Sequence, residues 1–106
     1  MISKYQGNFL YDKLSVGIFA PAFTGVYYCG HLDLNGSLLV DYVGRAQGDG
    51  VTIRSRLLDH LIDRWQGVTH FGFALCSSSL EATLFEIAEI KRFQPRYNTN
   101  GKSLFP

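Results

Sequence analysis

Long apolar runs are missing from this sequence of 106 residues. No stretch approaches the roughly 18–20 apolar residues that a membrane-spanning helix needs, and the first residues lack the apolar segment of a signal peptide. The two cysteines, Cys29 and Cys76, show neither a CxxC nor a Cys/His spacing, which argues against a disulfide framework and a zinc site. We therefore expect a cytoplasmic protein without a membrane partner.

A strong charge of either sign is missing as well, because Lys and Arg exceed Asp and Glu by only one, which gives a formal net charge of +1. The overall charge therefore does not by itself indicate a nucleic-acid partner. The basic residues do gather in two sequence clusters, Arg45, Arg54, Arg56 and Arg64 in the first and Lys91, Arg92 and Arg96 in the second. Such clusters suit a DNA-facing surface or ordinary solvated helix faces.

The order of periodic segments predicts one α+β domain over residues 1–106 with a core of about residues 25–98. Two β-rich runs flank Asn35-Gly36, a strong hairpin signal. A helix over 51–65, a strand over 70–76 and a helix over 79–93 follow. This β-β-α-β-α order predicts a three-stranded antiparallel sheet flanked by helices. Residues 1–20 are expected to be a loop-rich lead-in with at most one short element, and the tail is expected to be irregular.

A two-residue turn at Asn35-Gly36 would pair strand positions whose numbers add up to 71. Tyr27 would then face Gly44 and Cys29 would face Tyr42, so that both tyrosines project from one side of the sheet. A glycine opposite Tyr27 would leave its ring open to a ligand. The alternative is that both tyrosines simply pack on a core, and a loop of odd length would shift the register.

The two predicted helices carry the remaining polar candidates. Arg56 and His60 are four residues apart, at the border of the apolar face of the first helix, where they reach into a cleft or remain at the surface. The second helix is apolar around most of its circumference and should be buried on several sides. Glu86 falls inside that apolar arc, where a carboxylate is costly unless it binds a metal or forms an ion pair, for example with Arg56.

These segments together resemble the GIY-YIG endonuclease superfamily. Gly25-Val26-Tyr27 and Tyr42-Val43-Gly44 look like its GIY and YIG motifs, and Arg56 with His60 resembles its helical Arg-x-x-x-His/Tyr element. Residues 81–86, 90–93 and 95–98 are similar to the end of the N-terminal nuclease domain of bacterial excinuclease C. The resemblance implies the GIY-YIG fold and covers about residues 25–98.

The resemblance also implies roles for individual residues. Glu86 would hold one divalent ion, Mg²⁺ or Mn²⁺, Arg56 would brace the scissile phosphate, and Tyr27 would be the general base or position the attacking water. Only about 0.1% of free tyrosine is ionised at pH 7, and lowering its pKa by two units takes about 2.7 kcal/mol. The metal and nearby arginines are expected to supply that stabilisation.

Four further residues receive supporting roles from the same resemblance. Tyr42 and His60 would hydrogen-bond the phosphate or the nucleophile. Arg45 would be the basic residue that often follows the YIG motif and would bind substrate. Asn98 would anchor the tail near the site. The Gly-rich segment AQGDGVT, longer than in excinuclease-like members, is interpreted as an altered DNA-facing loop.

The expected function is therefore a divalent-metal-dependent DNA endonuclease that nicks one strand per active site, in DNA repair or another DNA transaction. Relatives usually have a separate DNA-binding domain. Recognition of DNA is therefore expected from residues 1–20, from a homodimer or from a DNA-binding partner protein, or it is largely absent. Two alternatives remain at this point: a nuclease subunit that is inactive without its partner, and a non-catalytic DNA-binding module on the same scaffold.

Overall fold

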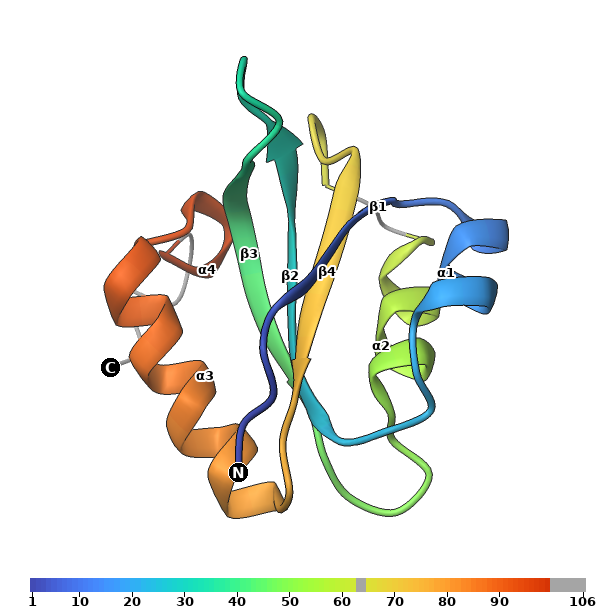
Figure 1. Ribbon diagram of the computed structural model, residues 1–106, viewed down its shortest axis with the longest axis vertical. Helices are drawn as coiled ribbons and strands as arrows, with labels where there is room; N and C mark the ends of the chain where they lie inside the picture. The colour runs from blue at the N-terminus through green and yellow to red at the C-terminus, as the bar shows by residue number, and fades with distance from the viewer. Residues whose placement is uncertain (63–64, 100–106) are drawn as a thin grey trace.

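The fold is built on one antiparallel sheet with helices on both faces, as the computed structural model shows for residues 1–62 and 65–99 (Figure 1). The strands lie in the order β1-β4-β2-β3. Helix α3 lies on one side of the sheet, and α1 and α2 lie on the other (Figure 1). In chain order the elements are β1 (Gln6–Leu10), α1 (Lys13–Phe19), β2 (Gly25–Leu32), β3 (Leu38–Ala46), α2 (Ile53–His60), β4 (His70–Leu75), α3 (Ser79–Phe93) and α4 (Arg96–Thr99).

The α+β class is confirmed, but the sheet has four strands and not three. The fourth strand, β1, comes from the lead-in, which also forms α1, so the prediction of at most one short element there is wrong. β1 is an edge strand that pairs only with β4 and is largely exposed. It therefore lacks the alternation that identifies a half-buried strand in a sequence.

The predicted helix boundaries are right for α3 and wrong elsewhere. α3 begins after Ser78, whose side chain accepts a hydrogen bond from the backbone N–H of Glu81, and spans residues 79–93 as expected. α2 begins after a capping box at Thr52 but ends at His60, short of the predicted residue 65. The tail, expected to be irregular, contains the short helix α4. Among the described residues no helix has the length and apolar character that crossing a membrane requires.

The hairpin between β2 and β3 reaches the predicted pairing by a different route. The last strand pair is Leu32–Leu38, so residues 33–37 form a five-residue loop. The Asp33 carboxylate accepts the backbone N–H groups of Asn35 and Ser37 within this loop at 2.8 and 3.0 Å. Beyond this odd-length loop His31 pairs with Leu39. A bulge at Asp41 then adds one residue to β3, and this restores the predicted pairs Tyr27–Gly44 and Cys29–Tyr42.

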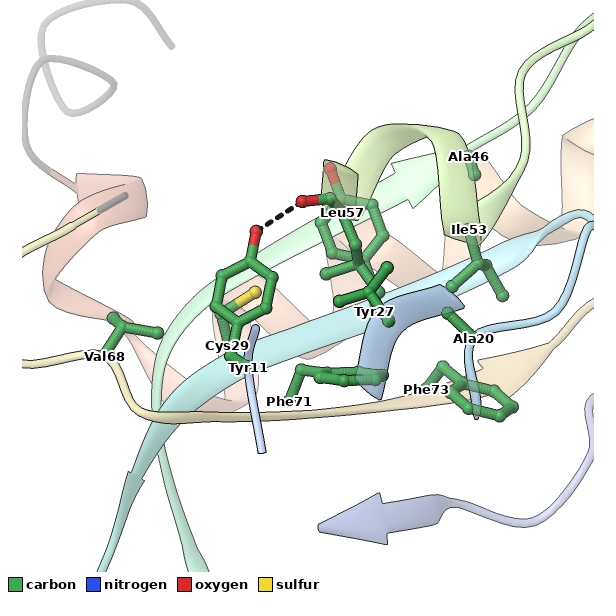
Figure 2. Packing of buried hydrophobic residues seen from close by; sticks show 11 residues of the cluster. Tyr11, Ala20, Tyr27, Cys29, Ala46, Ile53, Leu57, Val68, Phe71 and Phe73 are labelled. Carbon is green, nitrogen blue, oxygen red and sulfur yellow. Dashed lines mark hydrogen bonds between the residues drawn. The ribbon is translucent and has the colours of Figure 1, made fainter. Parts of the chain in front are cut away.

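Two hydrophobic clusters fill the two faces of the sheet. The cluster between the sheet, α1 and α2 is shown in Figure 2 and contains Tyr11, whose hydroxyl donates to the backbone carbonyl of Leu57 at 2.7 Å. The smaller cluster under α3 contains Val26, Tyr28 and Val43. Because β2 is covered on both faces, consecutive residues from Val26 to Cys29 are all at most 4% exposed.

The Tyr27 ring lies across Gly44, and a Cβ at that position would overlap the ring and its hydroxyl. We expect Gly44→Ala to lower the free energy of unfolding by about 1–3 kcal/mol, because the added methyl group overfills the cluster. Gly17→Ala is the matched control, since nothing lies within 4 Å of its Cβ position, and it should stabilise α1 by about 0.5–1 kcal/mol. Urea unfolding measures both changes, and equal effects would contradict the packing of Tyr27 on Gly44.

Candidate active site

A polar cavity of about 320 Å³ brings together most of the residues predicted from the sequence. Its lining comes from four segments, namely β2, the end of β3 with the following loop, α2 and α3. The lining residues are Tyr27, Tyr42, Arg45, Gln47, Val51, Arg56 and Glu86. Arg64 of the first basic cluster lies outside the described residues.

Tyr27 borders this cavity without exposing its ring. Its side chain is fully buried, so the expectation that the glycine opposite leaves the ring open to a ligand is wrong. The missing Cβ of Gly44 instead makes room for the ring itself. The Tyr27 hydroxyl oxygen lies 2.9 Å from Nε2 of His60, and the Arg56 guanidinium lies beside it. The polar end of Tyr27 is therefore held between an imidazole and a guanidinium.

Burial raises the pKa values of the two tyrosines at the site and lowers that of His60. It raises the pKa of Tyr27, and Tyr42 raises it further, while Arg56 offsets only part of this rise. Burial also raises the pKa of Tyr42, with Glu86 adding to the effect. It lowers the pKa of His60, and the positive charge of Arg56 lowers it further. At neutral pH the tyrosines are therefore protonated and His60 is neutral. In the His60 tautomer that carries its proton on Nδ1, Nε2 accepts the hydrogen bond from the Tyr27 hydroxyl.

A stack of aromatic rings holds His60 and Tyr42 in place. The Trp65 ring lies 4.3 Å from the ring of Tyr42 and 4.8 Å from that of His60, measured between centroids. Tyr97 lies on the outer side of Trp65 at 5.9 Å, and its hydroxyl donates to the backbone carbonyl of Gln66. The sequence pattern indicates Trp65 only as part of the apolar face of a helix, so its stacking on Tyr42 and His60 was not predicted.

Glu86 forms a buried ion pair, and its partner is Arg45. The Glu86 side chain is 8% exposed, and its Oε1 accepts from a terminal nitrogen of Arg45 at 2.5 Å. The suggested pairing with Arg56 is wrong, because Arg56 instead has a contact of 3.6 Å with the exposed Asp59. Gln47, which no sequence motif indicates, follows Arg45 by two residues along the chain. In the amide orientation that satisfies its neighbours, its oxygen accepts from Nε of Arg45 at 3.2 Å.

The residues around Glu86 fit a magnesium ion that keeps most of its water ligands. Within residues 1–62 and 65–99 no three His, Cys, Asp or Glu side chains gather as a metal cluster. Mg²⁺ often binds through only one or two carboxylates, and Glu86 borders a polar cavity with room for a hydrated ion. Arg45 contacts one of the two carboxylate oxygens of Glu86, so the guanidinium and a bound ion would compete for this carboxylate.

Helix α3 is oriented differently from the prediction. Its buried residues are Ala82, Glu86 and Glu89, whereas Leu84 and Ile87 are 59% and 56% exposed. Burial of two carboxylates is tolerated because each has a hydrogen-bond donor. Arg45 serves Glu86, and the Tyr28 hydroxyl donates to Glu89 at 2.6 Å. The helix is thus buried on one face only, and that face carries charge.

Asn98 acts on the site through the backbone of β3. Its Oδ1 accepts the N–H of Val43 at 2.7 Å, and its Nδ2 donates to the carbonyl of the same residue at 2.8 Å. The Asn98 side chain thereby takes the place of a neighbouring strand at the open edge of the sheet. Val43 lies between the cavity residue Tyr42 and Gly44, so α4 holds this part of β3. Asn98 itself does not line the cavity.

No family model, curated protein or solved structure matches this chain. The site is therefore interpreted from its own geometry and from the motifs in the sequence.

The depressed pKa of His60 gives a test of the site's electrostatics. Its NMR titration midpoint should lie below the ordinary value of 6.5, because the buried imidazole resists a second charge beside Arg56. The unfolded chain then binds a proton more readily than the folded chain. The stability that this difference provides is present above pH 6.5 and is lost as the pH falls towards the folded-state pKa.

Two arginine variants separate the causes of this shift. Arg56→Gln should move the His60 midpoint upwards, because it removes the neighbouring positive charge. Arg54→Gln is the matched control from the same helix, since Nε of Arg54 donates to the backbone of Ala20. A midpoint at or above 6.5 in the wild type, or the same midpoint in both variants, would contradict the arrangement.

Proposed function

We propose that this chain is a divalent-metal-dependent DNA endonuclease with the GIY-YIG fold, related to the nuclease domain of bacterial excinuclease C. One observation carries the proposal. Residues from β2, β3, α2 and α3, which span sixty positions of the sequence between Tyr27 and Glu86, converge on one polar cavity. Phosphate binding, proton transfer and metal binding need these residue types together. The motifs in the sequence indicate five of the seven lining residues, all except Gln47 and Val51, independently of their contacts.

The arginines supply the binding of the substrate. The Arg56 side chain is 37% exposed and that of Arg45 is 39% exposed, so both present N–H groups at the border of the cavity. A guanidinium donates to phosphate oxygens in a fixed planar geometry. Arg56 would brace the scissile phosphate and offset the negative charge that develops during hydrolysis. When bound at Glu86, a divalent ion would supply further charge neutralisation at the phosphate.

The Tyr27–His60 pair supplies the proton acceptor. The attacking water would give a proton to the Tyr27 oxygen while the Tyr27 proton passes to Nε2 of His60, at the observed distance of 2.9 Å. The water oxygen forms a bond to phosphorus, and the bond from phosphorus to the leaving oxygen breaks. That oxygen then takes a proton from solvent. Because no free phenolate accumulates, the raised pKa of Tyr27 does not prevent this role.

The Arg45–Glu86 ion pair favours a second candidate function. In this case the chain is a nuclease subunit that is inactive until DNA or a partner protein binds Arg45 and separates it from Glu86. A phosphate is a strong competing ligand for the guanidinium. Once Arg45 turns towards it, Glu86 is free to bind a metal ion. A non-catalytic DNA-binding module, by contrast, has no need of a buried carboxylate beside the cavity.

Nicking of supercoiled plasmid in the presence of Mg²⁺ or Mn²⁺ tests the proposed activity. Glu86→Gln should reduce the rate by a factor of at least about 100, because it removes the charged ligand of the metal ion. Glu81→Gln on the same helix is the matched control and should retain activity. The Glu81 carboxylate contacts the amino group of Met1 and accepts the backbone N–H of Ser77, away from the cavity. Full activity of Glu86→Gln would refute the metal-site assignment.

Arg45→Gln tests the competition for Glu86. Loss of the guanidinium leaves a buried carboxylate without its cation, so the apo variant should have a lower Tm. The affinity for Mn²⁺, measured by calorimetry, should rise on the order of tenfold, equivalent to about 1.4 kcal/mol, and Mn²⁺ should restore much of the lost Tm. Weaker Mn²⁺ binding than in the wild type would show that Arg45 supports the metal site.

A further inference from the structure

A second cavity, of about 390 Å³, lies on the α3 side of the sheet and shares no lining residue with the candidate active site. We refer to it as the α3 pocket. It lies between the C-terminal half of α3, the N-terminal segment that leads into β1, and the β2–β3 hairpin. Its chemically informative lining residues are Tyr5, Asn8, Tyr28, Glu89, Arg92 and Phe93. None of them has a part in the proposed hydrolysis.

Three aromatic rings form the floor and walls of the α3 pocket. Tyr28 is 4% exposed and forms the floor. The ring of Tyr5 stands at 75° to it at a centroid distance of 5.4 Å, and the ring of Phe93 stands at 83° at 6.1 Å. Tyr5 and Phe93 remain 45% and 37% exposed, so they retain free ring surface. Such surface suits the stacking of a flat ligand.

The Tyr5 wall is held in place before any ligand binds. Its ring lies across Gly72, where a Cβ would overlap the ring and hydroxyl. The hydroxyl donates to Oδ1 of Asn8 at 2.5 Å, and Asn8 in turn donates to the backbone carbonyl of Gly36 in the hairpin. Burial raises the pKa of Tyr5 to about 12, so this hydrogen-bond donor is present at neutral pH. A fixed wall lowers the entropic cost of stacking.

A buried carboxylate with spare acceptor capacity borders the same pocket. Glu89 is 5% exposed, and its Oε1 accepts the Tyr28 hydroxyl at 2.6 Å. A terminal nitrogen of Arg92, whose side chain is 68% exposed, lies 3.4 Å from Oε1 and 3.3 Å from Oε2. A carboxylate offers about four acceptor positions. When Arg92 turns to a phosphate of the ligand, Glu89 keeps its contact with Tyr28 and each of its oxygens has a position for one N–H group of the ligand.

Charge selects among flat ligands that donate N–H groups. The Arg92 guanidinium lies over the Phe93 ring at 4.5 Å from its centroid, so positive charge is already present at the pocket. Arg92 can bind a phosphate and Glu89 can accept N–H groups, so a ring that carries both an N–H edge and a phosphate would match both charges. Among the DNA bases only guanine presents two adjacent N–H donors, on N1 and N2, which match the two oxygens of a carboxylate.

We propose that the α3 pocket binds one guanine base of single-stranded DNA, stacked on Tyr5 or Phe93 and hydrogen-bonded to Glu89, with Arg92 contacting its phosphate. This inference rests on the proposed function for the identity of the polymer. Glu89 follows Glu86 by three residues, which is about 4.5 Å along the helix axis. Helix α3 thus carries one carboxylate for each of the two cavities. Binding of the base would direct the nuclease to single-stranded segments that contain guanine.

Titration of the ¹⁵N-labelled full chain with dGMP, dAMP, dCMP and TMP tests the pocket directly. We expect dGMP to bind at least tenfold more tightly than the other nucleotides and to shift the amide signals of Ser37, Glu89 and Phe93. Glu89→Gln should weaken dGMP binding at least tenfold. Tyr5→Leu, at a half-exposed position, should weaken dGMP binding several-fold. This variant tests the pocket even if Glu89→Gln does not fold. Equal binding of all four nucleotides would overturn the proposal.

Further measurements identify the source of the ligand and distinguish failure of the pocket proposal from failure of the nuclease proposal. A thymidine oligonucleotide with one central guanine should bind more tightly than dGMP, and the reverse order would overturn the assignment to DNA. Binding of N-acetylarginine amide without binding of dGMP would assign the pocket to a peptide guanidinium and overturn it as well. Glu86→Gln should bind dGMP normally even though it cannot nick plasmid. If the wild type nicks plasmid without selecting guanine, the pocket proposal fails and the nuclease proposal stands.

Discussion

The register of strand β3, on which the candidate active site depends, is held by one buried carboxylate in a bulge. Asp41 is the extra residue in β3, and its two oxygens contact His31 at 2.7 Å and Arg96 at 3.0 Å. A shift of one residue would move Tyr42 and Gly44 to the other face of the sheet. The bulge therefore keeps Tyr42 beside the cavity and leaves room for the ring of Tyr27. Because Arg96 also begins α4, the same carboxylate ties the covering helix to the edge of the sheet.

Helix α3 places two carboxylates inside the molecule. It exposes large apolar side chains such as Leu84 and buries Glu86 and Glu89, the reverse of an ordinary amphipathic helix. Buried carboxylates contribute little to net stability even when they are paired. Net stability therefore does not account for their placement, whereas the binding roles that we propose would explain it. Glu86 faces the polar cavity through its pair with Arg45, and Glu89 faces the aromatic α3 pocket.

Burial is also the common cause of the proton chemistry that we propose. It makes Tyr27 a weaker acid and His60 a weaker base than the free side chains. In the resting site the proton therefore stays on Tyr27, and His60 stays neutral and able to accept it. The positive charge of Arg56 opposes protonation of His60 and favours an anion nearby. A phosphate bound at Arg56 would offset that charge and ease the transfer of the proton to His60.

The sequence by itself determined the elements whose signals are local and the types of residue available to the site. The span of α3 follows from helical periodicity and capping, which act over a few neighbouring residues. The pairing of Tyr27 with Gly44 also needs the bulge at Asp41, which compensates for the odd-length loop. The tertiary structure alone decided that β1 is a fourth strand, that Glu86 pairs with Arg45, and that Trp65 stacks on Tyr42. An exposed edge strand has no periodicity of its own. Contacts between residues tens of positions apart depend on the packing of whole elements, which no spacing within one element encodes.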